Sequence, residues 1–127
     1  MSKERKYQID VQAQSTFLPE QSDPDDDTFV FSYRIVIRNS GDVAARLVSR
    51  HWIITDANGK VQEVRGLGVV GEQPVIEPGQ SFEYSSGCTL ETAFGTMSGS
   101  YQMEASDGAH FDAPIPEFIL SGPRVLH

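Results

Sequence analysis

The sequence predicts an all-β fold, an immunoglobulin-like or fibronectin type III-like antiparallel β-sandwich of about seven to eight strands. Short runs of alternating apolar and polar residues have the period of two that half-buried strands require. Turn-forming residues separate these runs, and no segment of ten or more residues has the apolar spacing of a helix. The chain has 127 residues, 39% of them hydrophobic, which suits one core. We therefore expect a single domain over residues 1–127.

The first two predicted strands flank an acidic loop. Apolar residues alternate with polar ones from Tyr7 to Ala13, which predicts the first strand. The segment Pro19–Asp27 carries two prolines and several carboxylates, so it fits neither a helix interior nor a central strand. The alternation is clearest from Thr28 to Asn39, which predicts a central strand of the sandwich.

The next two strands form a predicted hairpin. A turn over Asn39–Asp42 precedes a β-rich run, Arg46–Thr55, which holds the only tryptophan. The Asn-Gly pair at 58–59 suits the positive φ of a tight hairpin turn. Residues Val61–Val64 should therefore return antiparallel to the preceding strand.

Turn signals divide the remaining chain into further short strands. Glu77–Gln80 marks a turn before Phe82–Tyr84. Ser106–Gly108 joins the alternating run Tyr101–Glu104 to a strand-like segment, His110–Leu120.

Charge and cysteine content limit the classes of function. The net charge of −8 would repel a phosphate backbone, so nucleic-acid binding is disfavoured. No apolar run approaches the roughly 20 residues that span a bilayer, and the N-terminus lacks the features of a signal peptide. The single Cys88 cannot form an internal disulfide, which suits a reducing compartment. We expect a cytoplasmic protein that is not bound to a membrane.

The segment Gly66–Gly71 matches the glycine spacing of dinucleotide-binding loops. In those loops a helix follows and its N-terminus binds the pyrophosphate, whereas here Pro74 and Pro78 favour a turn and an extended segment. We therefore interpret the segment as a long glycine-rich loop between strands. The alternative is that successive backbone amides of this loop form an anion-binding nest without a helix.

No catalytic or metal constellation is evident. The three histidines are scattered, and the carboxylates of the acidic loop lack the spacing of a calcium loop. Cys88 has no local signature of a nucleophile and is expected to be a small core residue. We predict no catalytic residue, no metal ligand and no cofactor.

A charged and aromatic cluster adds further candidates for binding. A strand places Arg50 and Trp52 on one face and His51 on the other. We expect Trp52 in the core and Arg50 at the strand edge, with a role in recognition as the alternative. The candidates for ligand or partner binding are Arg50, His51, Arg65, Gly66, Gly68, Gly71, Glu72 and Gln73.

Several stretches together resemble the ApaG family. They are RHWIITDANG at 50–59, VVGEQP at 69–74, YSSGC at 84–88, GTMSGSYQM at 95–103 and FDAPIPEF at 111–118. The resemblance implies a fibronectin type III-like sandwich. The domain also occurs in eukaryotic F-box proteins and in a polymerase-interacting protein, which implies protein binding, and bacterial members are associated with cobalt and magnesium tolerance.

The leading prediction is a non-enzymatic binding module with an unknown protein partner, and a homodimer through edge strands is a further expectation. The alternative is a binder of a pyrophosphate-containing nucleotide or metabolite through Gly66–Gly71, with or without a divalent cation. A third prediction, direct binding of cobalt or magnesium, is suggested by the family resemblance and by the acidic loop.

Overall fold

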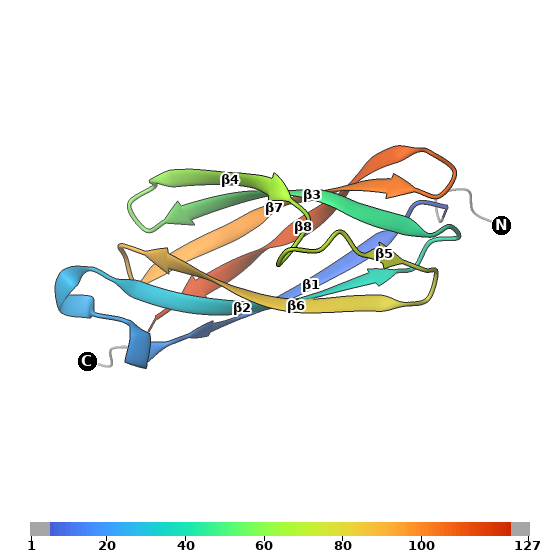
Figure 1. Cartoon of the computed structure of the whole chain (residues 1–127). Coiled ribbons are helices and arrows are strands. Elements are labelled where there is room, and N and C mark those ends of the chain that lie inside the picture. The colour runs from blue at the N-terminus through green and yellow to red at the C-terminus, as the bar shows by residue number, and fades with distance from the viewer. Residues whose placement is uncertain (1–5, 123–127) are drawn as a thin grey trace.

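The computed structural model describes residues 6–122 and contains eight strands in two antiparallel layers (Figure 1). The strands are β1 (Ile9–Phe17), β2 (Phe29–Asn39), β3 (Ala45–Asp56), β4 (Val61–Leu67), β5 (Val75–Ile76), β6 (Ser81–Leu90), β7 (Phe94–Ala105) and β8 (His110–Ser121). Two short 3-10 helices, η2 (Pro19–Gln21) and η3 (Pro24–Asp26), lie within the exposed acidic loop. The predicted all-β sandwich is confirmed. Among the described residues, no helix has the length and apolarity needed to cross a membrane.

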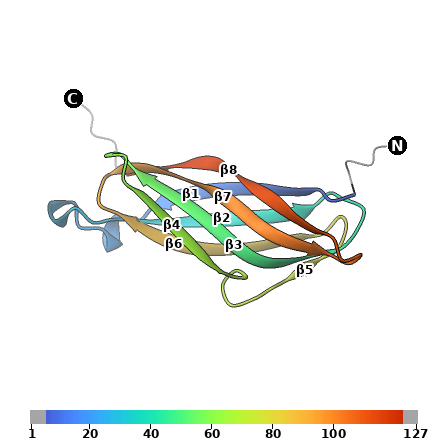
Figure 2. The same ribbon diagram turned by 90° about the horizontal axis from the view of Figure 1, so that it is seen from above.

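The two sheets have three and five strands. One has the order β1-β2-β6, and the other has the order β4-β3-β7-β8, with β5 paired to the beginning of β3. Figure 2 shows the two layers from above, with β1 and β8 on the same side of the molecule. The prediction that Thr28–Asn39 is a central strand is confirmed, because β2 lies between β1 and β6.

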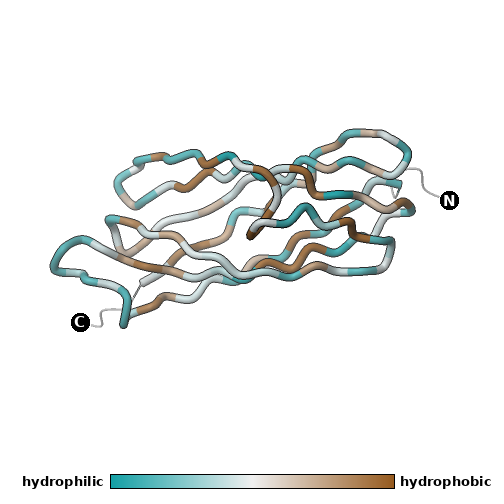
Figure 3. Tube along the Cα trace, viewed as in Figure 1, coloured by the Kyte–Doolittle hydropathy of each residue, from teal (hydrophilic) through white to brown (hydrophobic). Residues whose placement is uncertain are grey.

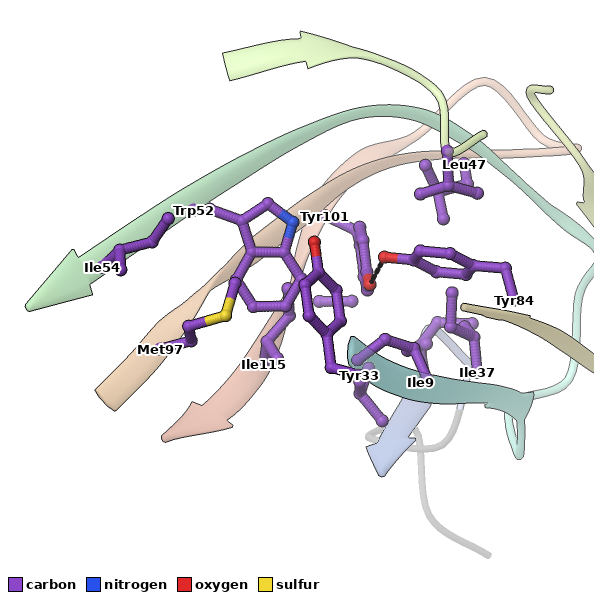
Figure 4. Close-up of a cluster of buried hydrophobic side chains, with 14 of the residues drawn as sticks. Ile9, Tyr33, Ile37, Leu47, Trp52, Ile54, Tyr84, Met97, Tyr101 and Ile115 are labelled. Atoms are coloured by element: carbon purple, nitrogen blue, oxygen red, sulfur yellow. Dashed lines mark hydrogen bonds between the residues drawn. The ribbon is translucent and has the colours of Figure 1, made fainter. Parts of the chain in front are cut away.

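The core lies between the sheets and follows the predicted alternation. In β2, every second residue from Phe29 to Asn39 is buried. Trp52 is 2% exposed and its ring packs edge-on against Tyr33 and Phe118, with centroid distances of 5.4 and 5.9 Å. The expected core position of Trp52 is therefore confirmed, and Figure 4 shows its indole among the buried side chains.

Two buried tyrosines from opposite sheets meet in this core. The hydroxyl oxygens of Tyr84 in β6 and Tyr101 in β7 lie 2.6 Å apart in a hydrogen bond (Figure 4). Burial raises the pKa of Tyr84 to about 12 and raises the pKa of Tyr101 also, while the nearby Arg50 guanidinium lowers both. Both phenols are therefore neutral at neutral pH.

The two lateral edges of the sandwich differ. On one edge, which we call the closed edge, β1 and β8 lie against each other, and the Ser15 hydroxyl donates to the Ile119 carbonyl at 2.7 Å. On the other edge, every residue of β4 is at least partly exposed. The chain after β4 descends between the layers, and Val69 and Ile76 are buried there, so they complete the core (Figures 1 and 3). We call β4 with residues 68–75 the open edge.

The predicted hairpin is confirmed, but its turn has three residues. The Asp56 amide donates to the Lys60 carbonyl at 3.0 Å, and the Gly59 amide donates to the Asp56 carbonyl at 3.1 Å. Gly59 has φ of +83°, whereas Asn58 has no positive φ. Strand β4 also continues beyond the expected Val61–Val64. The first strand is likewise displaced from its expected range and runs to Phe17.

A buried asparagine fastens the open edge to the end of β2. The Asn39 side chain is 1% exposed and donates to the carbonyls of Val43 and Ile76, both at 2.8 Å. Its side-chain oxygen accepts from the Gly41 amide at 2.9 Å. The side chain therefore stabilises the predicted turn after β2 and the position of β5 together.

Candidate functional site

The segment Gly66–Gly71 is the end of a strand followed by a tight turn. Gly66 lies within β4 opposite Arg50. Val69 and Glu72 exchange two backbone hydrogen bonds, 2.8 and 2.9 Å long, around Val70 and Gly71. These central residues have φ of +43° and +82°, the signature of a type I′ turn. The ordered loop is therefore shorter than the long glycine-rich loop expected from the sequence.

Two of the glycines make close contacts within the chain, and one of them is required by its contact. A Cβ at Gly66 would lie 2.8 Å from the Arg50 guanidinium carbon. At Gly68, φ is +60° and a Cβ would collide with the Glu72 carbonyl oxygen. A larger residue at position 68 would displace the loop, whereas at position 66 the end of the flexible Arg50 side chain would have to move. The glycine at position 68 therefore has a steric explanation that requires no ligand.

Backbone groups of this loop are largely engaged within the chain. The amides of Gly68, Val69 and Glu72 donate to backbone carbonyls at 2.8 to 2.9 Å. The Arg50 Nη1 atom donates to the carbonyls of Leu67 and Gly68, at 3.0 and 2.8 Å. An anion bound here would have to displace these contacts or use other amides. Gln73 fixes the far side of the loop, because its Nε2 donates to the Val48 carbonyl at 2.8 Å.

The charged candidates divide between two faces of the sheet. Arg50 shares the core-side face with Trp52, as predicted, and reaches over Gly66. His51 and Arg65 are opposite each other on the outer face. An open depression of about 570 Å³ lies beside His51 and Arg65, and its lining also includes Ser49, Arg50, Gly66, Leu67, Ser100, Gln102 and Asp112. Four of the eight candidates, Arg50, His51, Arg65 and Gly66, therefore line this depression, whereas Gly68, Gly71, Glu72 and Gln73 do not.

Sequence reasoning missed Glu63, which links the charged residues of the outer face. Its Oε1 lies 2.7 Å from His51 Nε2 and 3.5 Å from Arg65 Nη2. The hairpin register brings these side chains together, since Glu63 is diagonal to His51 across β3 and β4. The three-residue turn fixes that register, so the turn was the signal that could have found these contacts of Glu63.

Sequence reasoning also missed the apolar character of the open edge. Seven large apolar side chains are exposed among the described residues, and five of these seven lie between positions 61 and 75. They are Val61, Val64, Leu67, Val70 and Val75. Leu67 is 75% exposed and Val70 is 55% exposed. Clustering of this kind is typical of interaction surfaces, whereas single exposed apolar residues are ordinary.

The potential metal ligands of the described chain are dispersed, and its one cysteine is partly buried. Among residues 6–122, no three His, Cys, Asp or Glu side chains are grouped as a metal site would require. The Cys88 sulfur is half-buried and lies 3.7 Å from the sulfur of Met97. Burial raises the pKa of the Cys88 thiol to about 11, so the thiolate is scarce at neutral pH.

Comparison with known proteins identifies the family. The ApaG domain family matches residues 19–105. Protein ApaG of Azoarcus sp. (strain BH72) is 65% identical and Protein ApaG of Dechloromonas aromatica (strain RCB) is 62% identical over 127 residues, with full coverage of both chains. The crystal structure of a Bordetella pertussis protein described as ApaA is 50% identical, covers 95% of this chain and 98% of that chain, and has a TM-score of 0.92. The chain belongs to the ApaG family.

Proposed function

We propose that this chain is a non-enzymatic protein-binding module and that the open edge is its partner-binding surface. The observation that carries the proposal is the cluster of exposed apolar side chains on β4 and the loop after it. Burying such side chains against a partner contributes roughly 25 cal/mol for each Å² of apolar surface removed from water. The unpaired side of an edge strand adds backbone groups that a partner strand can satisfy.

The open edge is held in place before any partner binds. Val69 is 1% exposed and anchors the loop in the core, while Arg50 donates to the Leu67 carbonyl before the loop and Gln73 donates from the loop to the Val48 carbonyl of β3. A surface ordered in advance loses little conformational entropy on association, which favours binding. The exposed side chain of Val70 therefore projects from a fixed base.

The chemistry of the described side chains supports a non-enzymatic role. The buried Tyr84, Tyr101 and Cys88 all have raised pKa values and are neutral near pH 7. Within residues 6–122, the His51–Glu63 pair makes no hydrogen bond to a hydroxyl or thiol that it could activate, although Ser100 lies opposite His51 on β7. A catalytic role would need a nucleophile and a base in mutual contact.

Site-specific photocross-linking in cells tests this proposal. A photoreactive residue replaces Leu67 or Val70 on the open edge, and Ile119 on the closed edge serves as the control because it is 55% exposed, the same fraction as Val70. We expect discrete protein adducts from the open-edge positions and none from position 119. Identical adducts at all three positions, or none at any, would contradict the assignment.

The alternative of pyrophosphate binding at Gly66–Gly71 stays a prediction. Amide chemical shifts recorded while pyrophosphate or ATP is added, with and without magnesium, test it directly. Because the amides of Gly68, Val69 and Glu72 are already engaged, we expect no saturable shift. Saturable shifts confined to residues 66–73 would instead establish an anion site. The cytoplasmic location and any binding of cobalt or magnesium also stay predictions.

A further inference from the structure

Strand β4 has a self-complementary sequence. Read in both directions from Val64, its residues are Glu63 and Arg65, then Gln62 and Gly66, then Val61 and Leu67. We propose that two copies of the chain pair antiparallel through β4 about a two-fold axis at Val64. This inference rests on the proposed function, because it names a second copy as a partner for the same edge.

The backbone of β4 is oriented correctly for such pairing. Asp56 bonds with Lys60 at one end of the hairpin, and the Gly68 amide bonds with Val48 at the other. In an antiparallel ladder, hydrogen-bonded and non-hydrogen-bonded pairs alternate. The even-numbered residues of β4 therefore bond with β3. The odd-numbered residues, including Glu63 and Arg65, direct their N–H and C=O groups to the free edge.

Charge selects one register among the symmetric alternatives. With the axis at Val64, Glu63 of each copy faces Arg65 of the other, and Val61 faces Leu67. An axis at Glu63 would place that carboxylate against its own copy, and an axis at Arg65 would oppose the two guanidinium groups. Opposite charges across a strand pair stabilise it and like charges destabilise it. The axis at Val64 also joins free backbone groups only to free backbone groups.

The other edges of the sandwich are less suitable for self-pairing. Strands β1 and β8 lie against each other on the closed edge. Strand β6 also contains no proline and pairs with β2 without a bulge, but its one charged residue, Glu83, already pairs with Arg34 at 2.6 Å. No register of β6 against itself therefore brings opposite charges together. Strand β4 has seven residues, contains no proline, and pairs with β3 without a bulge. It therefore lacks several of the usual devices that prevent edge-to-edge association.

Charge reversal on β4 tests the pairing and its register. Sedimentation velocity is run from about 1 μM to about 1 mM, the range in which a small interface associates. We expect a concentration-dependent dimer for the unaltered chain and at least about ten-fold weaker association for E63R or for R65E alone. An equimolar mixture of E63R and R65E should restore the dimer, because every facing pair then has opposite charges. The matched control E83R, which reverses a charge on β6, should dimerise normally.

Disulfide trapping gives a second and independent reading of the register. With Cys88 replaced by serine, V64C should form an intermolecular disulfide on oxidation, because the axis places the two Val64 residues in a close non-hydrogen-bonded pair. Q62C lies on the same face but opposite Gly66 of the other copy, so it should cross-link far less.

The outcomes separate this inference from the proposed function. A chain that stays monomeric at about 1 mM, or a dimer unaffected by charge reversal with V64C uncross-linked, overturns the pairing. If discrete adducts with other proteins still form at Leu67 and Val70, the binding module stands without the dimer. If the mixture restores the dimer and the only adduct contains a second copy, the pairing stands and a different protein partner is rejected.

Discussion

The core is shielded from water in different ways at the closed edge and at the open edge of the sandwich. Two sheets facing each other leave their lateral edges open to water, and the closed edge is sealed by the approach of β1 to β8. The open edge is sealed by a loop, with Val69 and Ile76 inserted into the core. The core is therefore complete on both sides. The apolar side chains still exposed on β4 and its loop are not needed to close the fold, and this surplus supports a role in binding.

The largest expected loss of stability comes from removing the Asn39 side chain, which holds the open edge in place. Asn39→Ala would remove the side-chain hydrogen bonds to the carbonyls of Val43 and Ile76 and from the Gly41 amide. We expect the free energy of unfolding to fall by about 3 kcal/mol, because buried polar groups lose their hydrogen bonds. Urea denaturation measures the change. Ser40→Ala is the control, since that buried hydroxyl has no hydrogen-bond partner among residues 6–122 and its removal should cost little.

Truncating one core residue on each edge compares the two seals directly. Leu120 in β8 is fully buried, and Leu120→Ala should lower the free energy of unfolding by about 3 kcal/mol. Val69 has fewer methyl groups to lose, so Val69→Ala should cost about 2 kcal/mol. A negligible cost at Val69 would show that the loop does not seal the core. Chemical denaturation of both variants provides the measurement.

High pH should weaken the core next to the open edge. The folded pKa of Tyr84, about 12, and the raised pKa of Tyr101 lie above the ordinary tyrosine value of about 10. The stabilisation from the neutral phenols is thus complete below pH 10 and is lost as the pH rises toward the folded pKa values. The expected slope is about 1.4 kcal/mol per pH unit for each titrating phenol. Denaturation between pH 9 and pH 11 should show this loss, and Tyr84→Phe should reduce the slope.

The smallest expected change is a stabilisation. Val70 is a β-branched residue with φ of +43° at the first central position of the type I′ turn. Asparagine adopts this conformation more readily, so Val70→Asn should raise the free energy of unfolding by roughly 1 kcal/mol. A thermal melt measures it. If the more stable variant loses its photocross-linked partners, the Val70 side chain takes part in binding. If the variant is less stable instead, the backbone at Val70 is not strained as we infer.

The strands were predictable from the sequence because their alternation is local. The run over β2 has apolar residues at every second position, and one face must be buried wherever a sheet has a core. Trp52 followed from the same reasoning. The hairpin was predictable too, but its register was not, since a two-residue turn would pair Ala57 with Lys60, whereas the observed turn joins Asp56 to Lys60. A one-residue slip reverses the faces of a strand.

The open edge could not be predicted because its properties are not local. Val69 and Val70 are neighbouring valines, yet Val69 is 1% exposed and Val70 is 55% exposed. The tight turn between them and Glu72 creates the difference. The glycines suggested a long loop. In the folded chain, Gly66 instead lies within a strand, beside the guanidinium of Arg50. The roles of the candidate residues stay predictions, and the apolar surface beside them was not foreseen.

The hydrogen bond between Tyr84 and Tyr101 has a consequence for how the layers are aligned. Apolar contacts are nondirectional, so they hold two apolar sheet faces together without fixing the alignment of the sheets. The two hydroxyls come from different sheets and must meet within hydrogen-bonding distance. A slipped arrangement would leave both buried without partners, at a cost of roughly 1–3 kcal/mol each. The hydrogen bond between the two tyrosines therefore favours one alignment of the two sheets.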